Sequence, residues 1–181
     1  MIDKTDTQIT THIDKQTFRD AMARLAAAVT VVTSDGSGGL CGSTASAVCS
    51  VSDEPPILLV CINRASRNNA ILKSNQRLCV NVLRPEQQEL ALDFSRTGSN
   101  AEERFASGDW LSAAPGTTPG RPSPMLADAL VALDCSITES AEIGSHTVFY
   151  CTVETARFGT AGGALVYFGR DFHGVDGLPN T

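Results

Sequence analysis

The sequence predicts a mainly β domain, a small and mostly antiparallel barrel with short helices on its outside. The first observation is a series of about six or seven apolar stretches of strand length, separated by turn-forming residues. The second is that strands and helices do not alternate regularly, as they would around a parallel sheet. The third is size, because 181 residues, 42% of them hydrophobic, suit one domain with a substantial core.

The predicted strands are apolar runs bounded by glycine, proline and other turn residues. From 129 to 137 every second residue is apolar, which is typical of a half-buried strand. The stretch 40–51 is predicted as one long strand, ended by the two prolines at 55 and 56. Turns are predicted at 34–39, 139–144 and 159–163. The predicted strands are 29–33, 40–51, 57–62, 78–83, 129–137, 146–158 and 164–172.

Short helical patterns fall between some of these strands. The first begins at Thr17, a suitable N-cap, and places Phe18, Met22, Leu25 and Ala26 on one face. Further helices are predicted at 66–74, at 86–94 and, for one or two turns, at 101–106. The pattern weakens from 97 to 124, and the Pro- and Gly-rich stretch 115–122 is predicted to be a surface loop that covers the site as a lid.

Charge and the chain ends narrow the possible classes of protein. The formal net charge is −6 and the Lys and Arg residues are scattered, which argues against nucleic acid as the main partner. No apolar run approaches the roughly 20 residues of a membrane-spanning helix. Residues 1–16 lack the basic-then-apolar order of a signal peptide and are interpreted as a flexible arm. We therefore expect a cytoplasmic protein with its folded domain at 17–175 and a tail at 176–181.

The cysteine and histidine content argues against a metal site. No two cysteines form a Cys-x-x-Cys pair, and the chain has only three histidines. Most of the cysteines lie within apolar strands, so they are interpreted as reduced core residues of a cytosolic protein. They are Cys41, Cys49, Cys61, Cys79, Cys135 and Cys151.

Hydroxyl side chains crowd the stretch 43–52, which reads Ser-Thr-Ala-Ser-Ala-Val-Cys-Ser-Val-Ser. Buried hydroxyls need hydrogen-bond partners, so either they bond their own backbone or a polar ligand lies along them. Serine and threonine are also tolerated in exposed strands. Leu40, Val48 and Val51 favour an interior position here, and the small residues would let a flat ring approach the backbone closely.

A second polar stretch, 63–68, lies where a helix is predicted to begin. If Ser66 is the N-cap, the free N–H groups of the first turn, the helix dipole and Arg67 together favour an anion such as phosphate. The alternative is an ordinary N-cap beside a solvated arginine. With the hydroxyl-rich strand, this stretch indicates a nucleotide-like ligand.

Familiar catalytic motifs are missing from the sequence. Gly36-Ser37-Gly38-Gly39 is not the G-x-G-x-x-G fingerprint, and there is no P-loop, H-E-x-x-H or G-x-S-x-G motif. His12 lies in the arm and His173 near the C-terminus. His146 follows Gly-Ser at the mouth of a strand. It is either a rim histidine bonded to a backbone carbonyl or a functional residue.

These residues together resemble the short-chain flavin reductase family, the small components of two-component flavin-dependent monooxygenases. The matching segments follow the family's order from about Thr17 to His173, and the ordered set is specific although no single segment is decisive. They include Phe-Arg-Asp-Ala-Met-Ala-Arg-Leu at 18–25, Ser-Ala-Val-Cys-Ser-Val-Ser at 46–52, Pro-Pro-Ile-Leu-Leu-Val-Cys-Ile-Asn-Arg at 55–64, Leu-Cys-Val-Asn-Val-Leu at 78–83, Glu-Arg-Phe at 103–105, Gly-Ser-His at 144–146 and Leu-Val-Tyr-Phe at 165–168.

The resemblance implies an FMN-binding split β-barrel that forms a homodimer and binds FMN or FAD. Position by position, Thr44, Ala45 and Ser46 would run beside the edge of the isoalloxazine ring. Ser50 and Val51 would border the ring or the ribityl chain.

The resemblance also implies the rest of the site. The residues that would hold the ribityl chain and phosphate are Asn63, Ser66, Arg67 and Asn68. Phe94 would close the pocket, and His146 would sit near the nicotinamide of NADH or NADPH. The residues that would line the rest of the nicotinamide nucleotide site are Tyr167, Phe168 and Arg170. Many relatives carry a serine where this chain has Ala65, so one phosphate hydroxyl is missing here.

The implied activity is hydride transfer from nicotinamide to flavin N5. His146 would orient the nicotinamide, and reduced flavin would reach a partner monooxygenase by diffusion. Two alternatives stay open on the sequence. One is a non-catalytic flavin- or haem-binding split-barrel module, which would not need the Gly-Ser-His segment. The other is an oxidase of the pyridoxamine-phosphate type, which would require a more basic phosphate site.

Overall fold

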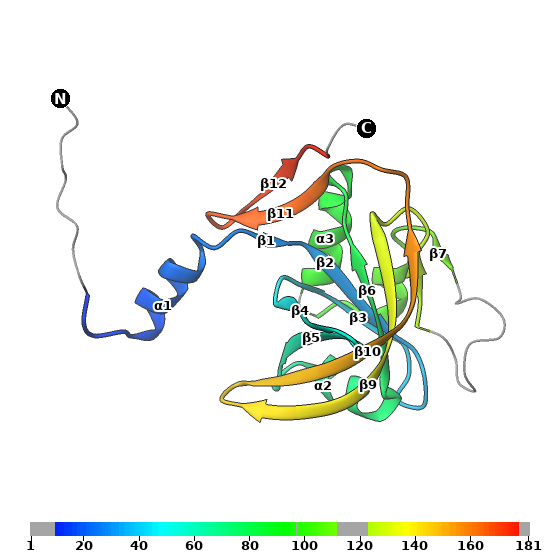
Figure 1. The fold of residues 1–181 in the computed structure, drawn as a ribbon, viewed down its shortest axis with the longest axis horizontal. Coiled ribbons are helices and arrows are strands. Elements are labelled where there is room, and N and C mark those ends of the chain that lie inside the picture. Colours follow the sequence, from blue (N-terminus) through cyan, green and yellow to red (C-terminus); the bar gives the residue numbers. More distant parts are fainter. Residues whose placement is uncertain (1–9, 97, 112–122, 178–181) are drawn as a thin grey trace.

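The computed structural model describes residues 10–96, 98–111 and 123–177. Its body is a seven-stranded antiparallel sheet in the order β3-β2-β6-β9-β10-β5-β4, curled into a barrel (Figure 1). These strands are β2 (Thr30–Ser34), β3 (Cys41–Ala45), β4 (Val48–Asp53), β5 (Pro56–Asn63), β6 (Arg77–Val82), β9 (Val131–Ile143) and β10 (His146–Phe158). The smaller sheets contain β1 (Ala27–Ala28), β11 (Ala164–Phe168) and β12 (Asp171–Val175), and the pair β7 (Trp110–Leu111) and β8 (Met125–Leu126). The mainly antiparallel β architecture predicted from the sequence is confirmed.

Short helices lie around this barrel. They are α1 (Lys15–Met22), α2 (Arg67–Asn75), the 3₁₀ turn η1 (Pro85–Gln87), α3 (Gln88–Ser95) and α4 (Ala101–Phe105). The N-cap of α1 is Asp14, which accepts a hydrogen bond from the Thr17 amide at 2.7 Å. The prediction of Thr17 as the N-cap is therefore wrong. The helix therefore begins inside the segment predicted as an arm. The predicted lid at 115–122 lies outside the described residues.

The predicted single strand at 40–51 is wrong, because it is two strands that lie on opposite edges of the large sheet. β3 pairs with β2, and β4 pairs with β5. Only Ser46 and Ala47 connect them, so the two edges must approach each other at this corner. This short connection curls the sheet, and two small residues at the corner leave the backbone accessible.

The predicted turn at 139–144 and the predicted strand at 164–172 also need correction. β9 continues to Ile143, and only Gly144 and Ser145 separate it from β10. The predicted strand 164–172 is a hairpin, β11 and β12, whose turn is Gly169-Arg170 with φ of 63° and 69°. Two-residue hairpin turns require positive φ, which glycine adopts freely. An arginine at such a position gives little sequence signal for a turn.

The core lies on both faces of the sheet. Val31 and Cys79 belong to a cluster that α3 covers, and the adjacent Val32 and Val80 belong to a second cluster with Leu72 of α2. This alternation follows from the two-residue period of a strand.

All six cysteines are free thiols, and four are buried. Burial raises the pKa values of Cys41 and Cys151 to about 12. Cys49 is exposed, which the prediction of core cysteines missed.

Two findings concern what the described ranges lack. No helix there has the length and apolar character needed to cross a membrane. Among the same residues, no group of three or more His, Cys, Asp or Glu side chains could hold a metal ion.

Candidate functional site

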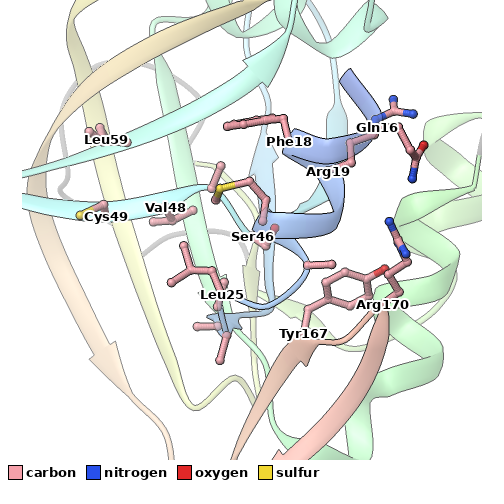
Figure 2. A pocket seen from close by; sticks show the side chains of 16 residues that line it. Gln16, Phe18, Arg19, Leu25, Ser46, Val48, Cys49, Leu59, Tyr167 and Arg170 are labelled. Atoms are coloured by element: carbon pink, nitrogen blue, oxygen red, sulfur yellow. The ribbon is translucent and has the colours of Figure 1, made fainter. Parts of the chain in front are cut away.

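The larger cavity lies between α1 and the corner that joins β3 to β4 (Figure 2). Its volume is about 940 Å³, within the range of small-molecule sites. Phe18 and Met22 line it from α1, Leu25 from the segment just after this helix, and Tyr167 and Arg170 from the β11–β12 hairpin. The floor is formed by small residues, at 26–28 and 46–47. A flat ring could therefore lie close to the backbone at this corner.

A second cavity of about 490 Å³ adjoins the first. Ser46, Tyr167 and Arg170 line both cavities, so the two are neighbours across these side chains. Thr44 and Ala45 line the second cavity only. The structure thus brings together five of the predicted site residues. The Thr44 hydroxyl donates to the carbonyl of Ala91 at 2.6 Å, and its hydrogen bond is therefore made within the protein.

The predicted phosphate residues gather at the N-terminus of α2. Ser66 is the N-cap and accepts from the Asn68 amide at 3.3 Å. The Asn63 side chain accepts from the Ala65 amide at 2.9 Å. The Asn68 side chain donates to the carbonyl of Gly42 in β3 at 2.9 Å. Arg67 is exposed beside these groups.

His146 also lies at this end of the molecule, because it pairs in register with Asn63. It is exposed, and its Nδ1 lies 2.9 Å from the Ser145 hydroxyl, so the partner is a side chain and not a backbone carbonyl. His146 does not line either cavity. Within one chain the structure therefore does not bring His146 to Tyr167 and Arg170.

The remaining predicted residues lie outside both cavities. Ser50 and Val51 are exposed on the edge strand β4, and Phe168 is exposed beside the β11–β12 turn. Phe94 is only 1% exposed and packs edge-on against Phe105 at 5.1 Å between ring centroids. The structure places Phe94 in the core, packed among aromatic neighbours.

Comparison with known proteins identifies the family to which this fold belongs. A family model described as "Flavin reductase like domain" matches residues 22–176, most of the chain. The chain belongs to the flavin reductase family. The family and the enzyme class predicted from the sequence are confirmed.

Individual members of the family are similar along most of their length. A Stutzerimonas stutzeri protein named "FMN reductase (NADH) RutF" is 44% identical over 172 residues, 95% of each chain. The "4-hydroxyphenylacetate 3-monooxygenase reductase component" of Pseudomonas aeruginosa is 48% identical, covering 88% of this chain and 91% of that one. A structure of the NADH:FAD oxidoreductase SgcE6 from Streptomyces globisporus, with NAD and FAD fragments, has a TM-score of 0.78 at 29% identity, over 88% and 92% of the two chains. The split-barrel prediction is confirmed by these likenesses.

Sequence reasoning missed the part that α1 plays in this flavin reductase's cavity. Gln16 and Arg19 line the larger cavity. Asp20 forms an ion pair with Arg170, and that hydrogen bond holds the pKa of Asp20 below its usual value. The signal was available in the residues Phe18, Met22 and Leu25. The apolar face of an amphipathic helix is expected to pack against another surface, and in this structure that face borders the larger cavity.

Proposed function

We propose that this protein is an NADH-dependent flavin reductase that supplies reduced flavin to a partner monooxygenase. Hydride transfer from nicotinamide C4 to flavin N5 is the chemistry that the two cofactors supply when bound. The supporting observation is the open apolar cavity with a small-residue floor and an adjoining second cavity, in a chain of the flavin reductase family. The protein's part is to hold two flat rings together and to exclude unproductive geometries.

β3 supports placing ring and phosphate at the two ends of one flavin site. Gly42 contacts Asn68 at the start of α2, and Ser46 lies at the cavities four residues later. Four residues of strand span about 13 Å. A flavin that lies along β3 would have its ring beside Thr44, Ala45 and Ser46. Its phosphate would meet the helix N-terminus, where Asn63, Ser66, Arg67 and Asn68 are gathered.

For the cofactors, we propose FMN and NADH. The relatives named FMN reductase (NADH) support this choice, whereas the similar Streptomyces enzyme is named for FAD. The hydroxyl missing at Ala65 would weaken the hold on either phosphate. Initial rates with each flavin and each nicotinamide nucleotide decide the matter: a preference of FAD over FMN, or of NADPH over NADH, would contradict the choice.

The experiment that tests the function itself uses pure protein, FMN and NADH under anaerobic conditions. Loss of the oxidised flavin's absorbance at catalytic protein concentrations is expected. If the absorbance stays unchanged while FMN binds, the protein is a non-catalytic flavin-binding module. Transfer of reduced flavin by diffusion predicts that a monooxygenase separated from the reductase by a dialysis membrane still receives it.

We also propose that the enzyme is a cytoplasmic homodimer whose second copy covers the apolar face of α1. No residue of α1 is buried: Phe18 and Met22 are 57% and 44% exposed, and Leu25, which extends this apolar face just after the helix, is 60% exposed. An isolated helix of eight residues is unstable in water, so this helix requires a partner surface.

Replacing Leu25 with aspartate is therefore expected to convert the dimer to a monomer, because a charge would enter the buried face. Size-exclusion chromatography with light scattering should give twice the chain mass of 19.1 kDa for the wild type and the single mass for Leu25→Asp. Phe158→Asp, at a side chain that is 79% exposed, should remain dimeric as the matched control. A dimeric Leu25→Asp protein would show that the apolar surface formed by α1 and Leu25 is not part of the interface.

His146 requires the second copy in a different way. We propose that it orients the nicotinamide, and it does not line the cavities of its own chain. In the homodimer, His146 of the partner subunit would face the cavity that Tyr167 and Arg170 line. Bonding between its Nδ1 and the Ser145 hydroxyl leaves Nε2 to meet the nucleotide.

A further inference from the structure

The charged side chains that line the larger, mostly apolar cavity are both cationic, although the protein is acidic. The chain carries a formal net charge of −6, yet the residues lining this cavity include Arg19 and Arg170 and no carboxylate among the described residues. Arg170 alone of the two also lines the second cavity. It stands where the cavities meet, with Tyr167 beside it in Figure 2. An anionic group on a ligand would be attracted to this point.

The backbone at Arg170 is unusual for an arginine. Its φ is 69°, in a two-residue turn that glycine and asparagine favour. Residues other than glycine adopt this region at some cost in free energy, and such positions cluster at functional sites. The turn places the guanidinium group between α1 and the cavity.

The guanidinium group of Arg170 forms an ion pair with Asp20 of α1. Arg170 Nη2 donates to Asp20 Oδ1, and Gln16 Nε2 donates to the same oxygen at 2.9 Å. The Arg170 and Asp20 side chains are 55% and 51% exposed. Exposed ion pairs contribute little to stability, so a competing anion can replace one partner. The pyrophosphate of a dinucleotide as a whole carries more charge than one carboxylate, and it can accept two parallel hydrogen bonds from arginine where Asp20 Oδ1 accepts one.

We propose that Asp20 holds the place of a nucleotide phosphate on Arg170, and that cofactor binding displaces it. Asp20 is then a competitor built into α1, which lowers the affinity of the site for its phosphorylated ligand. Because the flavin phosphate is proposed to lie at the N-terminus of α2, the phosphate at Arg170 is assigned to the nicotinamide dinucleotide. The inference rests on the proposed function only for the identity of the ligand.

Calorimetric titration tests the proposal without catalysis, with ADP-ribose and FMN as separate probes. Asp20→Asn removes the charge of the competitor, and we expect the Kd of one probe to fall about two- to fivefold, as suits an exposed pair. Arg170→Gln should weaken binding of that same probe. A change for ADP-ribose supports the assignment to the dinucleotide. A change for FMN instead would contradict it, and would also contradict the placement of the flavin phosphate at the N-terminus of α2.

The matched control is Glu139→Gln, which makes the same change in net charge at an exposed residue of β9. Equal effects of Asp20→Asn and Glu139→Gln would overturn the proposal, since they would reflect long-range charge. Unchanged affinity of Asp20→Asn for both probes would overturn it as well. If Asp20→Asn tightens binding but the protein reduces no flavin, the inference stands and the proposed function fails. If the protein reduces flavin but Asp20→Asn binds both probes with unchanged affinity, the proposed function stands and the inference about Asp20 fails.

Discussion

Replacing His146 with alanine is expected to lower the rate of NADH-driven flavin reduction by about tenfold or more, because orienting the nicotinamide contributes more than about 1.4 kcal/mol to the transition state. The loss should appear in kcat and in kcat/KM for NADH. The Kd of FMN should stay close to the wild-type value, since the proposed site holds the flavin ring along β3, away from His146. Stopped-flow measurement of flavin absorbance under anaerobic conditions gives these constants. His12→Ala, outside both cavities, is the control.

Mixed dimers test whether His146 acts from the partner subunit. Arg170→Ala lies on the cavity side of the proposed site, and His146→Ala removes the group from the other copy. In a dimer of one chain of each kind, one of the two sites would contain both intact residues. Random assembly should therefore restore about a quarter of the wild-type activity, because half of the dimers are mixed. If both residues served the site of their own chain, no site would be intact and no activity would return.

An unchanged rate for His146→Ala would remove this residue from the mechanism. The exposed position would then have the simpler explanation of a rim histidine held by Ser145. Loss of FMN affinity in place of the rate would also contradict the proposal. It would assign His146 to the phosphate end of the site, beside Asn63 of its own chain.

The fold was predictable where side-chain periodicity records the environment of a strand. The alternation from 129 to 137 follows the two faces of β9, and apolar runs bounded by turn residues located most of the remaining strands. Periodicity could not locate the corner at Ser46-Ala47 or the turn at Gly169-Arg170. At the corner the break depends on which strands pair, β3 with β2 and β4 with β5, and this pairing is a long-range property. At the turn, which joins the paired strands β11 and β12, an arginine at a positive-φ position gives little sequence signal.

The site was predictable only in part, for a related reason. Thr44, Ala45 and Ser46 meet Tyr167 and Arg170 at the cavities, as the family resemblance implied. His146 is on another hairpin, and a sequence does not show which chain of a dimer a residue serves. Asp20 was missed because its importance comes from a contact 150 residues away, with Arg170.

Phe94 shows how an aromatic residue at the end of a helix can be assigned to a pocket when it belongs to the core. It is 1% exposed, and its ring lies 5.1 Å from Phe105 and 5.3 Å from Trp110 between centroids. A Cβ atom added at Gly42 would lie 2.6 Å from the Phe94 ring, so β3 packs directly against this side chain. Phe94 thus packs against β3, the strand along which the flavin is proposed to lie.

Phe94→Ala is accordingly expected to cost about 3–5 kcal/mol of unfolding free energy, because it removes a buried ring and leaves a cavity. For a chain of this size the melting temperature should fall by roughly 6–20 °C. Phe158→Ala, at an exposed phenylalanine, should change the unfolding free energy by less than about 0.5 kcal/mol. Thermal and urea denaturation measure both variants. Below both transitions, the KM of Phe94→Ala for FMN should stay near the wild-type value. A raised KM with unchanged stability would instead place Phe94 over the flavin, and the packing of β3 against it would then be a minor part of its role.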